Sequence, residues 1–468
     1  MKNTSLGVTD VQIAYIGGGS RGWAWSFMTD LALEKQLGGT IRLYDIDHQA
    51  AEQNALIGSR ISARPDAVGK WRYLVADTLA QALTGADFVV ISILPGTFEE
   101  MQVDVHAPER YGIYQSVGDT AGPGGLSRAM RTLPMYVTIA QAIKTYAPDA
   151  WVINYTNPMA LCVRALYAVF PKVKAFGCCH EVFGTQKLLA HIAAEELGLA
   201  QINRAEIQVN VLGLNHFTWF DSASYRTHDL IPIYRRYVDA HFTEGYSDPD
   251  QNWANAFFCC AHRVKFDLFR RYGAIAAAGD RHLAEFMPGD EYLRDPATVS
   301  EWKFGLTSVA WRKQDQRQRL EKAARLASGL EETALTPTGE EGIVLIKALC
   351  GLTRVVSNVN LPNAAHQVSN LPHDCVVESN ALFERDAVRP IYAGELSPAV
   401  RELLEPHVRN QQDLLTAALT HDFSLALAAL QRDPLVKGRI SEPQARELLT
   451  TLLQGSVEYL PKAWNLPR

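Results

Sequence analysis

The stretch VQIAYIGGGSRGW, residues 11–23, decides the fold. It begins with a mostly apolar run typical of a buried strand and ends where a helical pattern starts. Between the two, Gly17 to Gly22 fit the spacing G-x-G-x-x-G. Glycines at this spacing permit a tight turn and let backbone N–H groups meet a pyrophosphate at a helix N-terminus. The stretch therefore predicts a strand–turn–helix unit that binds a dinucleotide.

Asp45 strengthens this prediction because it ends the next short strand, TIRLYDID, residues 40–47. An acid at this point can bond a ribose diol and repels the extra phosphate of NADP, so NAD is favoured. An ordinary glycine-rich turn is the alternative, but strand, helix and acid stand in register. The predicted cofactor-binding residues in these two segments are Gly17, Gly18, Gly19, Ser20, Arg21 and Asp45.

Strands alternate with helical stretches up to about residue 180. Further strands are predicted in WRYLVAD (71–77), ADFVVISILPG (86–96), AWVINYTNP (150–158) and KAFGCCHE (174–181). This alternation predicts an α/β protein with a Rossmann-like, doubly wound parallel sheet. We assign residues 1–198 to an NAD-binding domain.

The pattern of predicted strands and helices changes after residue 200. The segment 205–225, AEIQVNVLGLNHFTWFDSASY, alternates like antiparallel strands. Helical stretches are predicted at 252–272, 300–330, 339–356 and 398–453. We expect an α+β domain over residues 199–468 that serves substrate, metal and oligomerisation, an arrangement like that of lactate and malate dehydrogenases.

Composition excludes several classes of function. The 468 residues are 47% apolar with net charge -6, and no basic block is present, so neither nucleic acid nor an anionic membrane is an expected partner. We expect a cytoplasmic protein, because the sequence has no signal-peptide core and no apolar run of membrane-spanning length. The seven cysteines include two adjacent pairs and no C-x-x-C, so neither a disulfide framework nor a structural zinc site is indicated.

Two residues far apart in the sequence are candidates for chemistry. Cys179 follows a predicted strand end, and His216 lies near another in GLNHFTWF. They can be a nucleophile and its base, two metal ligands, or an inert core thiol and a structural histidine. Asn157, His180, Glu181 and the segment GDRH, 279–282, add polar groups that favour a functional site.

The pattern as a whole resembles family 4 of the glycoside hydrolases. The motifs that carry the resemblance run from residue 16 to residue 378: IGGGS (16–20), GDTAGPGG (118–125), RTLP (131–134), NYTNP (154–158), the Cys179-His180 pair, GLNHFTW (213–219) and NLPHDCVVE (370–378). Cys179-His180-Glu181-Val182 resembles the α-galacturonidase branch of that family. The segments 279–286 and 302–312, GDRHLAEF and WKFGLTSVAWR, resemble the same branch.

The resemblance implies an unusual hydrolysis, outside the two-carboxylate scheme of most glycosidases. NAD+ oxidises carbon 3 of the sugar, a base removes the proton at carbon 2, and the aglycone leaves by elimination. Water then adds, and the sugar is reduced again. A divalent metal, Mn2+ in the family, stabilises the charge on the sugar oxygens.

The resemblance also implies roles for individual residues. Cys179 and His216 match the metal ligands, although thiolate chemistry favours zinc, iron or cobalt, so other divalent metals stay open. Asn157 matches a residue near the nicotinamide and the substrate. His180 is expected to bond the substrate or to assist protonation of the leaving group. The tyrosine base of several members is absent here, and His282 or Asp280 is expected in its place.

A uronide substrate adds the need for a cation. Arginine binds a carboxylate through a bidentate fork, and Arg281 and Arg312 are the candidates. His180 and Glu181 complete the predicted substrate-binding set.

Alternative functions remain at this stage. Another α-glycosidase of the same family (α-glucosidase, α-galactosidase or α-glucuronidase) differs only in the sugar. A plain NAD-dependent hydroxyacid dehydrogenase on the same fold needs no metal ligands, and an NAD-binding sensor needs no turnover. The resemblance implies a homo-oligomer, either a dimer or a tetramer.

Overall fold

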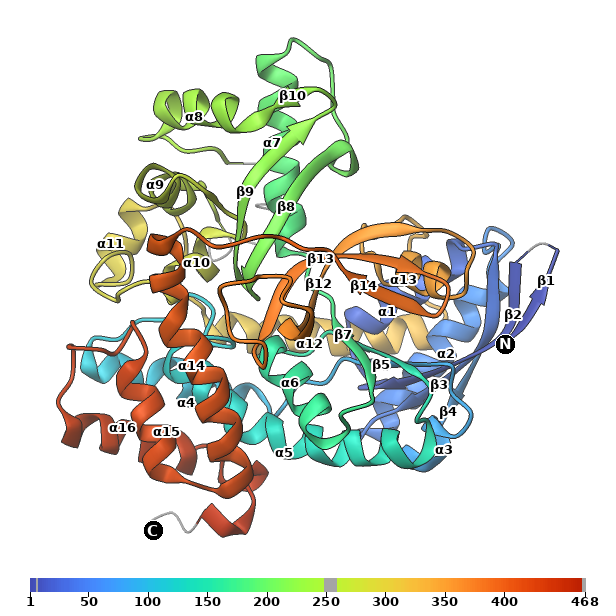
Figure 1. Ribbon diagram of the computed structural model, residues 1–468. Helices are drawn as coiled ribbons and strands as arrows, with labels where there is room; N and C mark the ends of the chain where they lie inside the picture. The colour runs from blue at the N-terminus through green and yellow to red at the C-terminus, as the bar shows by residue number, and fades with distance from the viewer. Residues whose placement is uncertain (6, 248–258, 465–468) are drawn as a thin grey trace.

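The computed structural model describes residues 1–5, 7–247 and 259–464 (Figure 1). Six parallel strands form one side of a ten-stranded sheet, in the order β4-β3-β2-β5-β6-β7, with β4 at its edge. Successive strands are added in one direction from β2 to β4 and in the opposite direction from β5 to β7. Sheets of this kind bind ligands at the carboxyl ends of the strands where this direction changes, here between β2 and β5. The prediction of a Rossmann-like doubly wound sheet is therefore confirmed. The strands are β2 (Gly7–Ile16), β3 (Leu37–Tyr44), β4 (Lys70–Val75), β5 (Phe88–Ile91), β6 (Trp151–Asn154) and β7 (Lys174–Gly177), and β1 (Lys2–Thr4) pairs with β2.

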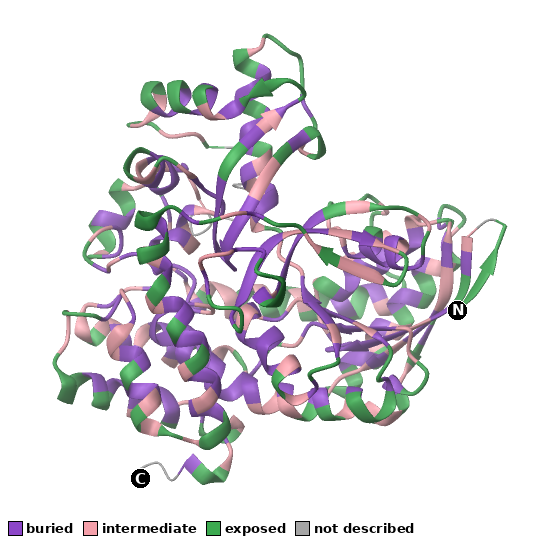
Figure 2. Ribbon diagram, viewed as in Figure 1, coloured by how far each residue is buried: buried purple, intermediate pink, exposed green. Residues whose placement is uncertain are grey.

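Helices cover both faces of this sheet. Alternate residues of β2 point to opposite layers: Ala14 and Ile16 join one apolar core, and Ile13 and Tyr15 join the other. Figure 2 shows the central strands buried and the outer faces of the helices exposed. The helices of this part are α1 (Trp23–Leu33), α2 (His48–Ala63), α3 (Leu79–Leu83), α4 (Phe98–His106), α5 (Gly122–Tyr146), α6 (Met159–Val169) and α7 (Glu181–Glu196).

A second, smaller sheet stands apart from the first in Figure 1 and packs against α7 and α8. Its strands β8 and β9 pair antiparallel, as the alternating segment predicted. The elements from residue 207 to 301 are β8 (Ile207–Leu214), β9 (Phe217–Tyr225), β10 (His228–Asp229), α8 (Leu230–His241), α9 (Arg263–Tyr272), β11 (Ile275–Ala276), α10 (Asp280–Phe286) and α11 (Pro296–Glu301).

Three strands from the C-terminal half return to the first sheet. β12 pairs antiparallel with β7, and β13 and β14 extend the same edge. Hydrophobic periodicity did not reveal β12, because its sequence VVSNVNLP places serine and asparagines at buried positions. The remaining elements are α12 (Val309–Ser328), α13 (Gly342–Leu349), β12 (Val355–Pro362), β13 (Val376–Glu384), β14 (Ala387–Pro390), α14 (Pro398–Thr420), α15 (Phe423–Arg432) and α16 (Glu442–Gln454).

Helix boundaries differ from the sequence prediction in several places. The stretch 300–330 is interrupted between α11 and α12, and 339–356 contains α13 followed by the start of β12. The stretch 398–453 contains three helices. Of the predicted helix 252–272, the structure has α9, and residues 252–258 lie outside the described residues. Short 3-10 helices occur at Pro108–Tyr111, Arg204–Glu206, Asn363–Ala365, Val457–Tyr459 and Lys462–Trp464.

Helix α5 starts at Gly122, inside the glycine-rich motif GDTAGPGG. Two distant side chains satisfy the N–H groups of its first turn: Asp433 accepts from Gly122 at 3.0 Å, and Gln115 accepts from Gly124 at 2.8 Å. These tertiary contacts compensate for the low helix propensity of glycine. Among the described helices, none is both long and apolar enough to cross a bilayer.

Candidate active site

The glycine turn lies where the sequence predicted it, between β2 and α1. A Cβ on Gly17, whose φ is 91°, would lie 2.0 Å from the carbonyl oxygen of Ser92, and one on Gly18 would lie 2.7 Å from the Cβ of Leu43. The backbone thus passes closer to its neighbours than any side chain allows. Helix α1 has no side-chain cap at Gly22, so the N–H groups of its first turn are available to an anion.

Asp45 is held beside this turn. Its Oδ2 accepts from the N–H of Gly19 at 2.8 Å, and its Oδ1 accepts from the N–H of Asp47 at 2.9 Å. Burial raises the pKa of this carboxyl. Arg21 pairs with Asp47 at 3.5 Å, and Ser20 donates its N–H to the carbonyl of Gly17. The predicted cofactor-binding segments therefore lie together at the carboxyl edge of the sheet.

Asn157 follows β6 in the loop that leads into α6. Its Nδ2 donates to Asp119 at 3.5 Å, and its carbonyl accepts from the Nε of Arg128 at 3.0 Å. Its Oδ1 is buried without a hydrogen-bond partner. A buried amide oxygen held in this way is a ready acceptor for a ligand hydroxyl.

The two adjacent cysteines after β7 face different surroundings. Cys178 packs against the core under α1 and α13, whereas Cys179 packs beside Met159 and Val376. Burial raises the pKa of both thiols, and nearby Glu378 raises that of Cys179 further. Only a cation at Cys179 would make its thiolate the favoured form.

His216 sits in the turn between β8 and β9, with a φ of 64°. Its Nδ1 lies 3.1 Å from the hydroxyl of Thr120, so its Nε2 remains as a potential ligand atom. Burial and the neighbouring His282 lower the pKa of His216 to about 3. The imidazole is therefore neutral at physiological pH, as a metal ligand must be.

Glu378, from β13, joins the strand end of Cys179 to the turn of His216. It accepts from Asn358 at 2.8 Å and from Asn215 at 3.4 Å, and Asn358 also donates to the carbonyl of Cys179 at 3.3 Å. Burial raises the pKa of Glu378 to about 7. Sequence reasoning did not assign Glu378, although it ends the motif NLPHDCVVE.

Asp119 is a second carboxylate that sequence reasoning did not assign. Thr120 donates to it at 2.7 Å. Burial opposes its ionisation, but Arg128, His216 and His282 outweigh burial and lower the pKa of Asp119 to about 2. The signal was present in GDTAGPGG, 118–125, which entered the sequence analysis only through the resemblance.

Glu181 connects the two other histidines. Its Oε1 lies 3.6 Å from His282 Nε2 and 4.0 Å from His180 Nε2, and its Oε2 accepts from the N–H of Gly279 at 2.9 Å. Burial opposes ionisation here too, but the histidines lower the pKa of Glu181 below its ordinary value, with His282 the largest contributor among them. His180 is half exposed and also lies 3.6 Å from Glu340.

The two predicted carboxylate-binding arginines are both largely withdrawn from solvent. Arg281 donates through Nε to the carbonyl of Gly305 at 3.2 Å, and through Nη2 to Thr307 at 3.0 Å and to the carbonyl of Ser116. Burial lowers its pKa to about 10. Burial also lowers the pKa of Arg312, and Asp119 is the largest influence in the opposite direction.

Asp280 lies apart from this group. Its Oδ1 accepts from the backbone N–H of Lys265 at 3.1 Å, at the start of α9. Burial raises its pKa to about 6. Its carboxylate faces the start of α9 rather than His216, so the structure gathers His180, His282, Cys179 and Asn157 around the site but not Asp280.

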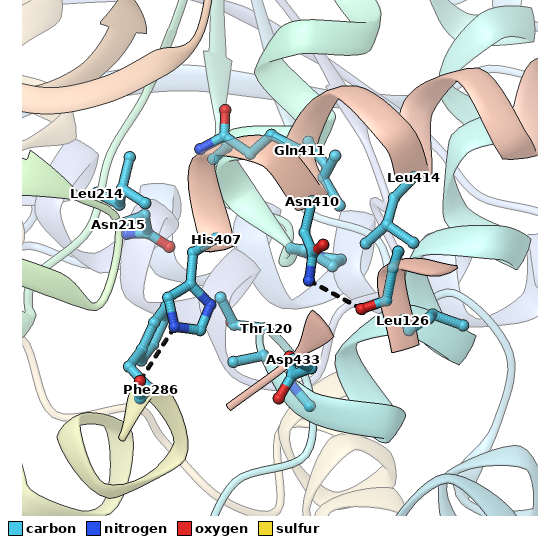
Figure 3. Close-up of a pocket in the computed structure, with 16 residues that line it drawn as sticks. Thr120, Leu126, Leu214, Asn215, Phe286, His407, Asn410, Gln411, Leu414 and Asp433 are labelled. Carbon is cyan, nitrogen blue, oxygen red and sulfur yellow. Dashed lines mark hydrogen bonds between the residues drawn. The ribbon is translucent and has the colours of Figure 1, made fainter. Parts of the chain in front are cut away.

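A pocket lies behind Thr120 and Asn215, between α5, α6, α14 and the turn of β8 (Figure 3). His407 and Asn410 extend into this region from α14, and Asp433 lies opposite them. The cavity volume is about 60 Å³, which holds a few waters but not a sugar ring. Thr120 and Asn215, which contact His216 and Glu378, form its wall on the side of the site.

The carboxyl edge of this Rossmann-like fold brings together a thiol, imidazoles, carboxylates and arginines. These features are typical of an enzyme built on a dinucleotide-binding fold. Residues 12–195 match the family model of family 4 glycosyl hydrolases, and residues 211–436 match that of their C-terminal domain. The chain belongs to family 4 of the glycosyl hydrolases and is a glycosidase, as the resemblance implied.

Individual relatives agree with this assignment. The α-galacturonidase of Lachnoclostridium phytofermentans is 62% identical over 466 residues, and that of Thermoanaerobacterium saccharolyticum is 56% identical over 467 residues. Both alignments cover 100% of each chain. Four relatives with this name are 51% to 62% identical.

Solved structures agree as well. The crystal structure of lplD from Bacillus subtilis has a TM-score of 0.90 at 50% identity, covering 95% of this chain and 100% of the other. A 6-phospho-α-glucosidase from gut microorganisms, in complex with NAD and Mn2+, has a TM-score of 0.78 at 18% identity, covering 97% and 99%. The latter likeness shows the shared fold.

Proposed function

We propose that this protein hydrolyses α-galacturonides with the help of NAD and a divalent metal. The observation that carries the substrate is the full-length identity of 51% or more to relatives named α-galacturonidase. The cations of the site support it, because Arg128, Arg281 and Arg312 each interact electrostatically with Asp119. An arginine at this place can bind the carboxylate of an anionic sugar.

The residues present fit the two implied cofactors. The turn at Gly17, Gly18 and Gly19, with Asp45 beside it, would hold NAD, which when bound exchanges a hydride with carbon 3 of the sugar. Cys179 and neutral His216 would hold the metal, Mn2+ in the related 6-phospho-α-glucosidase complex, which when bound polarises the sugar oxygens. Two protein ligands leave positions for substrate, and the thiol keeps zinc, iron and cobalt open.

We assign the base to His282 in preference to Asp280. The carboxylate of Glu181 lies 3.6 Å from Nε2 of His282 and favours a proton on that nitrogen, while the buried Nδ1 has no hydrogen-bond partner among the described residues. An imidazole in that tautomer presents a lone pair on Nδ1, which can take the proton from carbon 2. Burial lowers the pKa of His282, which keeps the ring unprotonated and ready to act.

The remaining residues orient the sugar. The buried Oδ1 of Asn157, which has no hydrogen-bond partner among the described residues, accepts a hydrogen bond from a sugar hydroxyl. His180, half exposed and next to the proposed ligand Cys179, assists the departure of the aglycone. Glu181 holds His282 from one side. Arg281 or Arg312 is the proposed clamp on the substrate carboxylate.

A panel of aryl α-glycosides tests the proposal: galacturonide, glucuronide, galactoside, glucoside and 6-phosphoglucoside, each with NAD+, Mn2+ and a thiol. We expect cleavage of the galacturonide without net formation of NADH, and uptake of deuterium from the solvent at carbon 2. Cleavage of the glucoside but not the galacturonide would reject the substrate. Stoichiometric NADH without release of the aglycone would instead indicate a hydroxyacid dehydrogenase.

Three further proposals concern the whole molecule. Residues 1–198 form the NAD-binding part and 199–468 the part that serves substrate and metal, although β12 to β14 belong to the first sheet. The protein acts in the cytoplasm. It assembles as a homodimer or homotetramer, which sedimentation equilibrium of the purified protein tests directly, since a monomer at all concentrations would contradict it.

A further inference from the structure

A second group of potential metal ligands lies at the joint between α9 and α10. Cys260 and His262 precede α9, and Asp280 is the first residue of α10. One ligand atom from each residue lies within 4.8 Å of the other two. Within the described part of the chain, this is the group of three such residues that comes together most closely around a common point. The proposed ligands Cys179 and His216 are not members of it.

Two polar atoms of this group have no hydrogen-bond partner among the described residues. They are the buried Oδ2 of Asp280 and the buried Nε2 of His262. The two side chains are 0% and 3% exposed. Leaving such an atom unsatisfied destabilises the folded state, and a charged group does so more, so a protein interior ordinarily supplies a partner. A cation between the three side chains would satisfy the carboxylate directly.

The local backbone brings the ligands together. His262 has a φ of 57°, in the left-handed region, and is the N-cap residue just before α9. This turn places His262 Nδ1 3.8 Å from the sulfur of Cys260. Cys260 is itself fixed by a bridge to Phe304. A non-glycine residue in this conformation is uncommon and persists only where the surroundings determine it.

We propose that Cys260, His262 and Asp280 bind a divalent cation of the zinc class, separate from the catalytic metal. A thiolate, an imidazole and a carboxylate are ligands that zinc accepts together, at about 2.3 Å, 2.0 Å and 2.0 Å. Ligand atoms at those lengths lie roughly 3.5 Å apart in a tetrahedron, close to the 3.8 Å found between sulfur and nitrogen. Water completes the coordination.

Lys265 is the cation that opposes the metal. It is 1% exposed, and its Nζ donates to the hydroxyl of Thr185 at 2.6 Å. The thiolate and the carboxylate together bring two negative charges, which balance the charge of a divalent metal. The metal would fix α10, which carries Arg281 and His282 in its first turn.

The test uses full-length protein without a histidine tag, carrying Cys179→Ser and His216→Asn so that the other proposed metal pair is absent. After removal of metal with a chelator, the protein is dialysed against Zn2+ and zinc is counted by mass spectrometry. We expect one zinc ion per chain. Reloading with Co2+ is expected to give the near-ultraviolet absorption of a sulfur-to-cobalt bond, which reports the thiolate ligand independently of activity.

Adding Cys260→Ala is expected to abolish both signals, and adding Cys259→Ala instead is the matched control that retains both. Lys265→Met, which removes the opposing cation, is expected to retain or tighten binding. If circular dichroism shows that the Cys260→Ala protein does not fold, Asp280→Asn decides, with affinity for Zn2+ expected to fall roughly tenfold or more. Absence of zinc from the Cys179→Ser, His216→Asn protein after dialysis against Zn2+, or zinc and cobalt signals that survive the loss of Cys260, would overturn the proposal.

Discussion

The imidazole rings of His216 and His282 lie with their centroids 3.9 Å apart, tilted by 40°. Two imidazoles at this distance in a buried site cannot both be in the positively charged, doubly protonated form, since each positive charge disfavours the other. Burial and this neighbour together keep His216 neutral. The two rings therefore have the different roles that we propose: His216 offers a lone pair to a metal, and His282 offers one to a proton.

The first prediction concerns the outer partner of the metal pair. Glu378→Gln puts an amide NH2 where Asn215 or Asn358 now donates to a carboxylate oxygen. The strand end of Cys179 and the turn of His216 then lose their common anchor. We expect affinity for Mn2+ to fall about 10-fold to 100-fold, measured by titrating activity of metal-free protein. Glu384→Gln on the same strand, at an ion pair near the surface, is the control and should leave the titration unchanged.

The second prediction concerns the dinucleotide turn. Gly17→Ala places a Cβ 2.0 Å from the carbonyl oxygen of Ser92 at a positive φ. We expect NAD binding to weaken roughly tenfold or more, which corresponds to about 1.4 kcal/mol, measured by calorimetry. Gly85→Ala has the same backbone strain but open space around the new methyl group. Equal loss of NAD binding in both variants would show that strain, rather than the close approach, is responsible.

The third prediction concerns pH and stability. Burial lowers the pKa of His407 to about 4, while the unfolded chain titrates at 6.5. The unfolded state therefore binds a proton first as the pH falls, and stability is lost from pH 6.5 towards pH 4. His407→Gln keeps a donor to the carbonyl of Phe286 but does not titrate. The loss of unfolding free energy between pH 7.5 and pH 5 should be smaller by about 2 kcal/mol in this variant.

Urea denaturation at the two pH values measures this difference. His228→Gln, on the exposed strand β10, serves as the control. An unchanged difference between wild type and His407→Gln would show that other groups cause the acid sensitivity.

The fourth prediction concerns recognition of the carboxylate. Arg312→Lys keeps the charge but removes the planar fork, so KM for a galacturonide should rise about tenfold while kcat/KM for the corresponding galactoside changes little. Arg317→Lys, exposed on the same helix α12, is the matched control. An equal effect on both sugars would place Arg312 in the support of the site and leave Arg281 as the next candidate for the clamp.

Sequence reasoning succeeded where the determinants are local or follow from a topological rule. The turn at Gly17 and the acid Asp45 belong to one strand–turn–helix–strand unit, so spacing alone located them. Cys179 and Asn157 follow neighbouring parallel strands, whose carboxyl ends meet at one edge of the sheet. Their proximity was therefore predictable before any coordinates.

The missed residues depend on pairings between distant segments. Glu378 reaches Cys179 only because β13 joins the first sheet through β12, whose polar sequence concealed it. Asp119 and Arg128 flank the start of α5, where a Gly-Pro-Gly-Gly sequence predicts a turn rather than a helix. Asp280 was placed near the chemistry by its neighbours in sequence, but the first turn of α10 directs it towards α9.

The return of β12 to the edge of β7 has a consequence for how the protein is made. All six parallel strands have been synthesised once the ribosome reaches residue 177, but β12, which pairs with β7, begins only at Val355. During the synthesis of those intervening residues the growing chain carries an unpaired edge, which is a template for association with other chains. Synthesis that stalls between the two strands should leave an aggregation-prone product. Chaperones that bind nascent chains should bind this one most strongly in that interval.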